Sequence, residues 1–340
     1  MFKKIILKNN TVTPALFLAP MAGITHSVFR RLVSDFGGYG ALFTEMLSGK
    51  ALIHEKLHTS PYAKKRPCEG NVIYQLVLNG HEDIERIVNK LRDVAPFGLD
   101  VNLGCPAPKI RNQGSGTGLF NDLKQLSHVL EMVRKYWDGI LTVKCRLGEH
   151  TEEWFSEFKK RLAVFDACGI DAITVHPRFI KEKLKRRARW EIFSKITENT
   201  AIPVIGNGDI QNIQQIEDSN THFQTLSGLM LGRISVVKPW VFAEFNTTLN
   251  TLSSGTSSSS INYLKVWETF YHYAIEDFPP EKALGRIKEF SSYYAQNFFY
   301  GHEFYRAIQG SKNLTQLYEN GLLFLDKEPM LYQNISCRSY

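Results

Sequence analysis

Short apolar runs alternate with longer amphipathic stretches from residue 15 to about residue 235. A short apolar run bounded by turn residues predicts a buried strand, and apolar residues three or four positions apart predict a helix with one buried face. Eight strands are expected, at Ala15–Ala19, Ala41–Glu45, Val72–Val77, Leu99–Leu103, Leu141–Arg146, Asp171–His176, Pro203–Gly206 and Gly228–Gly232. The stretches between them predict helices at Ser27–Phe36, Glu82–Asp93, Leu123–Trp137, Glu152–Cys168, Trp190–Glu198 and Ile210–Asp218.

Strands separated by helical crossovers form a parallel sheet, and this number of strands favours a closed (β/α)8 TIM barrel over an open sheet. The predicted fold class is α/β, with the barrel over residues 1–245 and a small all-helical C-terminal domain over residues 262–340. Residues 246–261 are rich in serine and threonine, which predicts a linker. Helices in the C-terminal domain are expected at Tyr263–Tyr273, Pro280–Phe299 and Glu303–Gln309.

Aromatic residues are concentrated between Ser291 and Gly301. We interpret most of them as the core of a helix bundle, with a base-stacking surface as the alternative.

The composition, 43% hydrophobic and 22% charged, is that of a soluble globular protein. No segment approaches the length of a membrane span, and the apolar run near the N-terminus is too short for a signal-peptide core. The five cysteines are odd in number and lack metal-ligand spacing, so we expect a reduced, cytoplasmic protein with no metal site. Neither a membrane nor an obligate protein partner is indicated.

The net charge of +7 is unevenly distributed. Between Lys181 and Arg189 six basic residues accompany one acidic residue, and a second basic cluster lies at Lys64–Arg66. Such runs are commonly solvated loops. Their concentration also favours nucleic acid as a partner.

Polar groups follow the carboxyl ends of the predicted strands, at the rim that builds the active site of a TIM barrel. They are Pro20-Met21-Ala22-Gly23, Glu45, Gln75, Asn102 with Cys105, Lys144 with Arg146, His176 with Arg178, Asn207-Gly208-Asp209 and Gly232-Arg233. A single buried lysine or glutamine could be structural, but a ring of such groups indicates a charged or hydrogen-bonding ligand.

The stretch Leu99–Pro106 ends one of these strands in a thiol. Alternation places Asp100, Asn102 and Gly104 on one face, and the proline keeps Cys105 extended beyond the strand. A polar face leading to a thiol suits a ligand site, although a free cysteine is often simply a small buried hydrophobe. Alternation also directs Cys145 towards the helices, and Cys168 is expected in the core as well.

Two motifs are typical of phosphate binding. Gly206–Ile210 follows the seventh strand, and Gly232-Arg233 follows the eighth. The loops after these strands form the usual phosphate site of a TIM barrel, with glycines for close backbone approach and an arginine fork for the anion. The glycine run Gly114–Gly118 lacks dinucleotide-binding spacing, so we interpret it as a flexible loop at the rim.

The motifs together resemble those of the tRNA-dihydrouridine synthases. The resemblance covers the barrel and continues more weakly through Arg286–Gln309, which resembles that family's tRNA-contacting helical domain. It is carried by Ala19-Pro-Met-Ala-Gly-Ile-Thr25, Tyr74-Gln75, Asn102-Leu-Gly-Cys-Pro106, Lys144-Cys-Arg146, His176-Pro-Arg178, Gly206-Asn-Gly-Asp-Ile210 and Gly232-Arg233. The family has aspartate where this chain has His26, which we expect to cap or brace the first crossover helix.

The resemblance implies the FMN-dependent reduction of a uridine in tRNA to 5,6-dihydrouridine, with NADPH or NADH as reductant. It implies that FMN is bound by Pro20, Met21, Ala22, Gln75, Lys144, His176, Asn207, Gly208, Asp209, Gly232 and Arg233. Asn102 and Arg178 are expected near the uracil or the flavin. The basic loop, with Lys183, Lys185, Arg186 and Arg187, is expected to grip the tRNA backbone.

The implied chemistry gives Cys105 the role of proton donor. Hydride transfer to C6 of the uracil builds negative charge towards C5, which then needs an acid on the side opposite the flavin. A thiol with an ordinary pKa of about 8.5 is mostly protonated at neutral pH and can supply that proton. The target base must also leave its stack to reach the barrel.

Two other functions remain open on the sequence. One is an FMN-dependent TIM-barrel reductase of a small molecule, similar to dihydroorotate dehydrogenase. The basic loop and the helical domain argue against it, because a small substrate needs neither. The other is a non-catalytic tRNA-binding protein, against which Cys105, Lys144, His176 and Arg233 argue.

Overall fold

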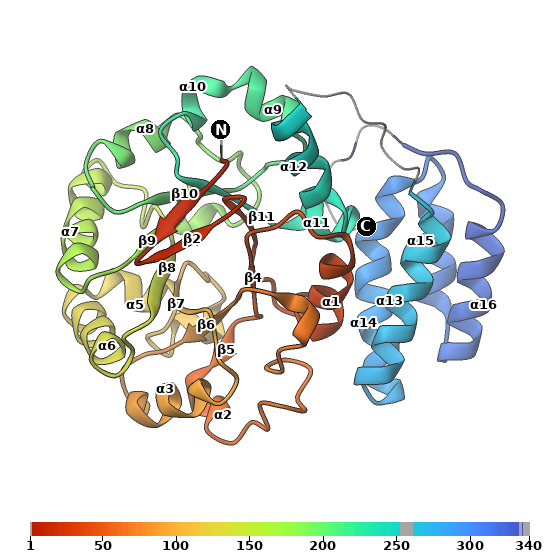
Figure 1. Cartoon of the computed structure of the whole chain (residues 1–340), viewed down its shortest axis with the longest axis horizontal. Coiled ribbons are helices and arrows are strands. Elements are labelled where there is room, and N and C mark those ends of the chain that lie inside the picture. The colour runs from red at the N-terminus through yellow and green to blue at the C-terminus, as the bar shows by residue number, and fades with distance from the viewer. Residues whose placement is uncertain (1, 252–260, 333–334, 336–340) are drawn as a thin grey trace.

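The computed structural model describes residues 2–251, 261–332 and 335. Eight parallel strands close into a ring through pairing of the last strand with the first and of β4 with β6 (Figure 1). The strands are β3 (Leu16–Leu18), β4 (Ala41–Phe43), β6 (Val72–Val77), β7 (Gly98–Leu103), β8 (Ile140–Arg146), β9 (Ala172–His176), β10 (Val204–Asn207) and β11 (Gly228–Leu231). The predicted TIM barrel is confirmed. A short ninth strand, β5 (Leu47–Ser48), extends the sheet beside β6.

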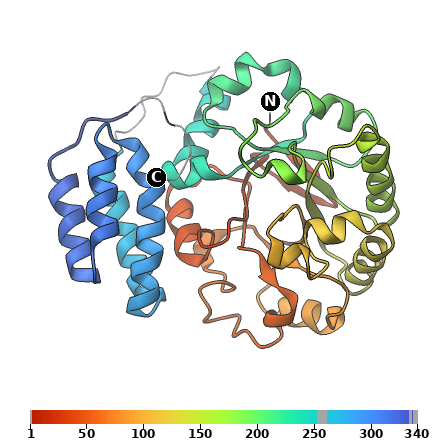
Figure 2. The same ribbon diagram turned by 180° about the vertical axis from the view of Figure 1, so that it is seen from behind.

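Helices surround the barrel, as the crossover pattern predicts (Figures 1 and 2). The crossover helices are α1 (Ser27–Phe36), α3 (Ile84–Arg92), α6 (Leu123–Tyr136), α7 (Trp154–Ala167), α8 (Ile192–Thr197) and α9 (Ile213–Asp218). Asp83 and Asp122 cap α3 and α6 by accepting backbone N–H groups, which explains where these helices begin. Shorter helical segments are α2 (Gly49–Leu52), η1 (Pro67–Glu69), α4 (Pro108–Arg111), α5 (Thr117–Asn121), η2 (Ile180–Glu182) and α10 (Asn220–Phe223).

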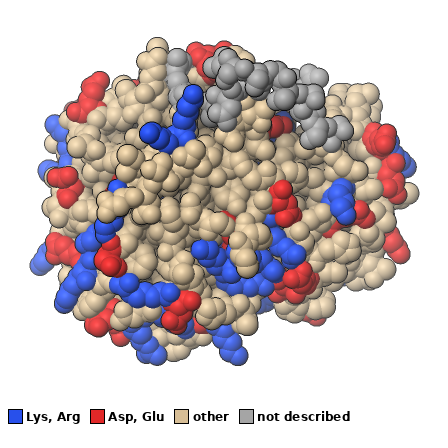
Figure 3. All heavy atoms as spheres, viewed as in Figure 1, with Lys and Arg blue, Asp and Glu red and all other residues tan. Residues whose placement is uncertain are grey.

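An N-terminal hairpin that the sequence pattern did not predict covers one end of the barrel. It consists of β1 (Ile5–Leu7) and β2 (Asn10–Val12), which pair antiparallel. The N–H of Ala15, just before β3, donates to the carbonyl of Phe2. The hairpin therefore lies at the amino ends of the strands, away from the rim that carries the polar motifs. It faces the viewer in Figure 1, and on that face basic and acidic side chains are interspersed (Figure 3).

The helical C-terminal domain lies beside the barrel (Figures 1 and 2). After α11 (Arg233–Val237) and α12 (Val241–Thr251), it contains α13 (Tyr263–Asp277), α14 (Pro280–Tyr294), η3 (Ala295–Asn297), α15 (Gly301–Gly310) and α16 (Leu314–Leu325). The predicted linker over 246–261 thus begins inside α12, and its residues 252–260 lie outside the described part of the chain.

The sequence pattern missed α16, although Asn313 followed by Gln316 is a helix-start signal. The N–H of Gln316 donates to Asn313 Oδ1 at 2.9 Å, and the N–H of Lys312 donates to Gln316 Oε1 at 2.8 Å.

Most aromatic residues of the C-terminal domain lie in its core, as expected. Trp267 is fully buried and donates to Ser291 Oγ at 2.9 Å, and Gly321 of α16 lies against its ring. Phe290 and Tyr294 are also fully buried. Phe299 and Tyr300 differ, because they are 52% and 54% exposed.

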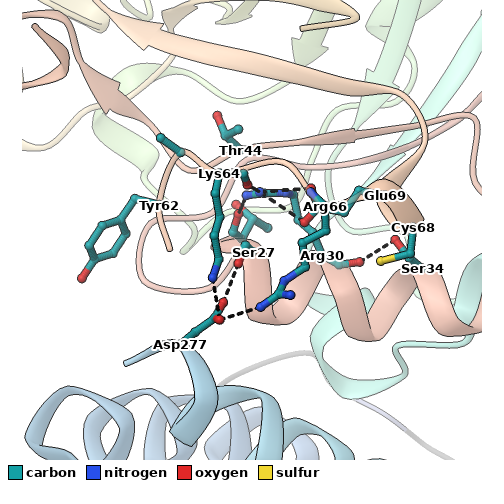
Figure 4. Close-up of polar contacts among 12 residues, drawn as sticks. Ser27, Arg30, Ser34, Thr44, Tyr62, Lys64, Arg66, Cys68, Glu69 and Asp277 are labelled. Atoms are coloured by element: carbon teal, nitrogen blue, oxygen red, sulfur yellow. Dashed lines mark hydrogen bonds and ion pairs between the residues drawn. The ribbon is translucent and has the colours of Figure 1, made fainter. Parts of the chain in front are cut away.

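Asp277, at the end of α13, ties the domain to the barrel. It accepts hydrogen bonds from Ser27 at 2.7 Å, from Lys64 at 2.6 Å and from Arg66 (Figure 4). Beside this cluster, Arg30 of α1 and Glu69 of η1 form a fully buried ion pair. Lys64 and Arg66 of the second basic cluster are therefore structural partners of the helical domain.

His26 was expected either to cap or to brace α1. It occupies the N-cap position, but its side chain makes no capping hydrogen bond and packs instead against the helical domain. The imidazole is 1% exposed and packs edge-on against Phe278 at 5.0 Å between ring centroids. Burial lowers the pKa of His26 well below its usual value, with further lowering by Arg286 and Arg30. A neutral imidazole suits this largely apolar contact between barrel and helical domain.

No helix in the described ranges is both long enough and apolar enough to cross a membrane.

Candidate active site

The carboxyl ends of the strands surround a pocket of about 200 Å³. Nine of the predicted cofactor-binding residues line it: Pro20, Met21, Lys144, His176, Asn207, Gly208, Asp209, Gly232 and Arg233. Ala22 is exposed in the loop that follows, and Gln75 is fully buried beside the pocket in a hydrogen-bond network. Residues that are more than 200 positions apart in the sequence thus meet at one place, because parallel strands present their ends at the same rim.

The pocket has the features of an anion site. It combines the glycines of the loops after β10 and β11 with the guanidinium of Arg233. Asn207 faces inward and donates to the carbonyl of Met230 at 2.8 Å, which ties these two strands together. The lining also includes the apolar groups of Ala19, Pro20 and Met230, and Ala19 lies next to Gly232. A cation, glycine backbone and apolar groups in one pocket suit an anionic ligand that also has an apolar portion.

Gly208 has a positive φ of 116°, and a Cβ atom there would lie 2.7 Å from Cδ2 of His176. Glycine is required at this position because of the positive φ and because of the close approach of His176. This close approach places the loop after β10 directly against the imidazole at the end of β9.

His176 is buried and neutral. Burial, followed by the charges of Lys144 and Arg146, lowers its pKa well below the usual value. Its Nε2 lies 2.6 Å from Nη1 of Arg178. Because arginine can only donate, Nε2 must accept, and the ring proton is on Nδ1. His176 therefore offers a fixed N–H donor to a ligand.

Arg178 is 2% exposed and holds other residues of the site in place. Its Nη2 donates to Asp209 Oδ1 at 2.7 Å, and its Nε donates to the carbonyl of Arg186 at 2.6 Å. Arg233 approaches the same Asp209 carboxylate at 3.1 Å. Burial alone would raise the pKa of Asp209, but hydrogen bonds from Arg178 and the Ala188 N–H lower it below its usual range. Asp209 thus stays ionised between the two arginines.

Lys144 projects from β8 into the same pocket. Burial lowers the pKa of Lys144 to about 8, with a further contribution from Arg146, while Asp100 and Cys105 act in the opposite direction. In the strand register Lys144 is opposite Asn102. Lys144 therefore lies next to the strand that leads into the loop of Cys105, although Cys105 is not among the residues that line the pocket.

A buried hydrogen-bond network runs from Asp100 to the thiol-bearing loop. Asp100 accepts from Thr142 at 2.6 Å and from Gln75 at 2.7 Å, and Gln75 in turn accepts from Asn102 at 2.8 Å. Burial raises the pKa of Asp100 to about 6 despite these hydrogen bonds. Strand alternation had placed Asp100 on the polar face, but its role as the base of this network could not be read from the sequence.

The backbone of Cys105 is held on both sides. Its N–H donates to Asn102 Oδ1 at 3.0 Å, and its carbonyl accepts from Thr117 at 3.2 Å. The expectation of a flexible loop at Gly114–Gly118 is therefore wrong for its second half, where α5 begins at Thr117. The Cys105 side chain is partly exposed, whereas Cys145 and Cys168 are buried as expected.

The basic loop lines part of a larger hollow of about 840 Å³ next to the pocket at the strand ends, with Asp209 and Arg233 lining both. Lys183, Lys185, Arg186 and Arg187 are all exposed. Buried arginines from the strand ends fix the backbone of this loop: Arg146 donates to the carbonyl of Lys183 at 2.8 Å, and Arg178 donates to that of Arg186. The charged side chains are thus presented to solvent from an anchored loop.

The Dihydrouridine synthase (Dus) family model matches residues 17–324. The chain belongs to the dihydrouridine synthase family. It is 31% identical over 239 residues to a probable tRNA-dihydrouridine synthase of Helicobacter pylori, covering 68% of this chain and 71% of that protein. It is 28% identical to tRNA-dihydrouridine synthase B of Proteus vulgaris, covering 69% of this chain and 72% of the relative. This dihydrouridine synthase is accordingly a flavin-dependent oxidoreductase.

Solved structures support the fold of this dihydrouridine synthase independently. The old yellow enzyme from Trypanosoma cruzi superposes with a TM-score of 0.53 at 8% identity, covering 82% of this chain and 98% of that one. An old yellow enzyme homologue from Zymomonas mobilis gives a TM-score of 0.51 at 10% identity, covering 79% and 95% of the two chains. At these identities the likeness concerns the barrel architecture alone.

Proposed function

We propose that this dihydrouridine synthase reduces a uridine of tRNA to 5,6-dihydrouridine, with FMN as its flavin and NADPH or NADH as its reductant. The family match and the tRNA-dihydrouridine synthases among its relatives support this substrate. The observation that carries the proposal is the position of Asn102, which holds the backbone of Cys105 and lies beside Lys144 in the strand register, while Lys144 lines a pocket suited to a flavin.

Different pocket residues suit different parts of FMN. Gly208, Gly232 and Arg233 suit the phosphate, because the glycines allow close backbone approach and Arg233 supplies a cation. Pro20 and Met21 suit the flavin ring. Bound FMN, in its reduced form, supplies the hydride that C6 of the uracil receives. Lys144 and the Nδ1–H of His176 provide a cation and a donor beside the ring, where negative charge has to be stabilised.

Cys105 completes the reaction at the opposite side of the pyrimidine. Hydride addition at C6 leaves negative charge over C5, C4 and O4, and the thiol donates its proton to C5. The resulting thiolate lies near Lys144, whose positive charge favours it electrostatically. The hydrogen bonds to Asn102 and Thr117 hold the backbone of Cys105 in place, so little backbone freedom of this loop is lost when the base arrives.

The substrate has to enter from the strand ends, and a stacked base cannot do so. We propose that the target uridine is turned out of its stack and that the basic loop contacts the flanking phosphates. Lys183, Lys185, Arg186 and Arg187 suit this role because they are exposed on an anchored loop beside the pocket. Arg178 and Asn102 then act mainly by orienting His176 and Cys105.

The direct test is a reconstituted assay. Purified protein is incubated with FMN, NADPH or NADH, and tRNA that lacks dihydrouridine, and the tRNA is then analysed for dihydrouridine by mass spectrometry. We expect a yellow protein that introduces dihydrouridine at specific uridines. Protein that stays colourless after incubation with FMN contradicts the flavin assignment and favours a non-catalytic tRNA-binding protein. Yellow protein that reduces orotate or enones but not tRNA favours a small-molecule reductase.

A further inference from the structure

The loop from Pro20 to Thr25 connects the pocket at the strand ends, which we propose binds FMN, to the helical domain. Pro20 and Met21 line the pocket, and the next residues form a tight turn in which the N–H groups of Ile24 and Thr25 donate to the carbonyl of Met21. Gly23, at the outside of this turn, has both backbone polar groups engaged by distant side chains. Displacing Gly23 therefore displaces a wall of the pocket.

The two partners of Gly23 come from different domains. Its N–H donates at 2.9 Å to Oε2 of Glu45, which follows β4 of the barrel and is 8% exposed. Its carbonyl accepts at 3.0 Å from Nη1 of Arg286, which belongs to α14 of the helical domain. The loop is thus held between the barrel on one side and the helical domain on the other.

Arg286 is itself held in a defined position. Glu289, one turn along α14, accepts from Nη1 at 3.1 Å, and Nη2 is 3.4 Å from the hydroxyl of Tyr62. The guanidinium also lies 5.8 Å from the Tyr62 ring centroid and 5.9 Å from that of Phe278. These contacts orient the donor towards the Gly23 carbonyl.

Position 23 favours glycine because its φ is 80°. A Cβ atom there would also lie 2.7 Å from the Glu289 carboxylate and 2.8 Å from Nη1 of Arg286, so the ends of these two side chains would have to move away from the loop. The loop and α14 are therefore complementary in shape as well as in hydrogen bonding.

From these contacts we infer that Arg286 is a positioning residue for the flavin, through which the helical domain fixes the loop that borders the pocket. The inference rests on the proposed function, because it takes the pocket to bind FMN. It gives the helical domain a role in the chemistry of the barrel that is separate from contact with tRNA. The bond from a charged donor to a peptide carbonyl is of the stronger kind, so its loss should be measurable.

The test compares Arg286→Met with Arg286→Lys and with Arg31→Met. Arg31 makes a different contact between the domains, a 2.8 Å ion pair with Glu276, and lies outside the pocket and the loop, so R31M is the matched control. Hydrogen exchange followed by mass spectrometry on the apoprotein reports on the loop without flavin. We expect exchange in peptides covering residues 20–25 to be roughly tenfold faster in R286M and unchanged in R31M.

The same variants are then titrated with FMN, following flavin fluorescence and the visible absorption bands. R286M should bind FMN roughly tenfold more weakly, with shifted flavin bands, and R286K should recover part of the affinity. Normal exchange in R286M overturns the inference, and so does faster exchange with unchanged FMN affinity and bands. A loss equal in R31M and R286M also overturns it, because general loosening of the domain interface then explains the data. Wild-type protein that binds no FMN instead contradicts the proposed function, and the exchange result still reports on the loop.

Discussion

Asn102 accepts the backbone N–H of Cys105 through Oδ1, while its amide nitrogen donates to Gln75. This side chain joins the reactive thiol loop to a network that ends at the fully buried Asp100. The backbone that carries the thiol is therefore held from the interior of the barrel, where side chains have few alternative conformations.

Replacing Asn102 with alanine should slow proton transfer without removing the thiol. The substitution leaves Gln75 Oε1 buried without its donor and releases Cys105 from one of its two backbone contacts. We expect a loss of about 1–3 kcal/mol in the free energy of unfolding, measured with urea. Single-turnover oxidation of reduced flavin by tRNA should slow roughly a hundredfold, a size typical of misplaced catalytic groups. Because the effect acts through the thiol, N102A should add little further loss in a C105A background.

Cys105→Ala should preserve binding of flavin and tRNA and remove most of the turnover. The thiol is partly exposed and accounts for none of the hydrogen bonds that hold the loop, which use its backbone. Single-turnover oxidation of reduced flavin by tRNA should fall by about two to four orders of magnitude, the range of general acid catalysis. Cys68→Ala, which removes an exposed thiol elsewhere, serves as the control. An unchanged rate in C105A contradicts the assignment of Cys105 as the acid.

The barrel and its rim could be predicted because they depend on local patterns. Alternation within a strand placed Lys144 on the inward face and Cys145 among the helices, and the structure has both as expected. Contacts between segments far apart could not be predicted in the same way. Arg178 binds Asp209, 31 positions away, and Arg286 binds Gly23, 263 positions away. Such pairs depend on how strand ends and domains are placed, which a one-dimensional pattern does not encode.

Some helix ends could not be predicted from the sequence pattern either. The polar composition after residue 245 predicted a linker, yet α12 continues to Thr251, because serine, threonine and asparagine lower helix propensity without forbidding a helix. In α1 the N-cap position holds His26, whose environment is set by Phe278 of the helical domain. The residues next to His26 in the sequence therefore suggested a cap or a brace, but they could not show that the imidazole contacts the helical domain.

Neutralising the basic loop should weaken tRNA binding and reduce its dependence on salt. The variant replaces Lys183, Lys185, Arg186 and Arg187 with glutamine. Each lost phosphate contact lowers the slope of log K against log salt by roughly 0.7 to 0.9, so the loss of several contacts flattens the curve visibly. Equilibrium binding at several salt concentrations measures it.

A matched control neutralises four exposed lysines on the outer helices of the barrel: Lys124, Lys135, Lys159 and Lys160. The control variant should retain the wild-type slope. If the loop variant keeps that slope as well, the basic loop does not contact the tRNA backbone.

Lys144 should destabilise the protein below pH 8 when no flavin is bound. Burial lowers its pKa from 10.5 to about 8, so the folded state holds this proton less tightly than the unfolded chain does. The resulting decrease in the free energy of unfolding is fully present below pH 8, and it disappears as pH rises from about 8 to 10.5. Lys144→Met should therefore raise the free energy of unfolding of the apoprotein by about 2 kcal/mol at pH 7, with a gain that shrinks across this interval. Urea unfolding of K144M and wild type at pH 7, 8, 9 and 10 measures the difference, with the exposed Lys135→Met as a control that should show no such trend. A K144M protein that is less stable than wild type at pH 7 contradicts the buried-charge account and points to Lys144 as a packing residue.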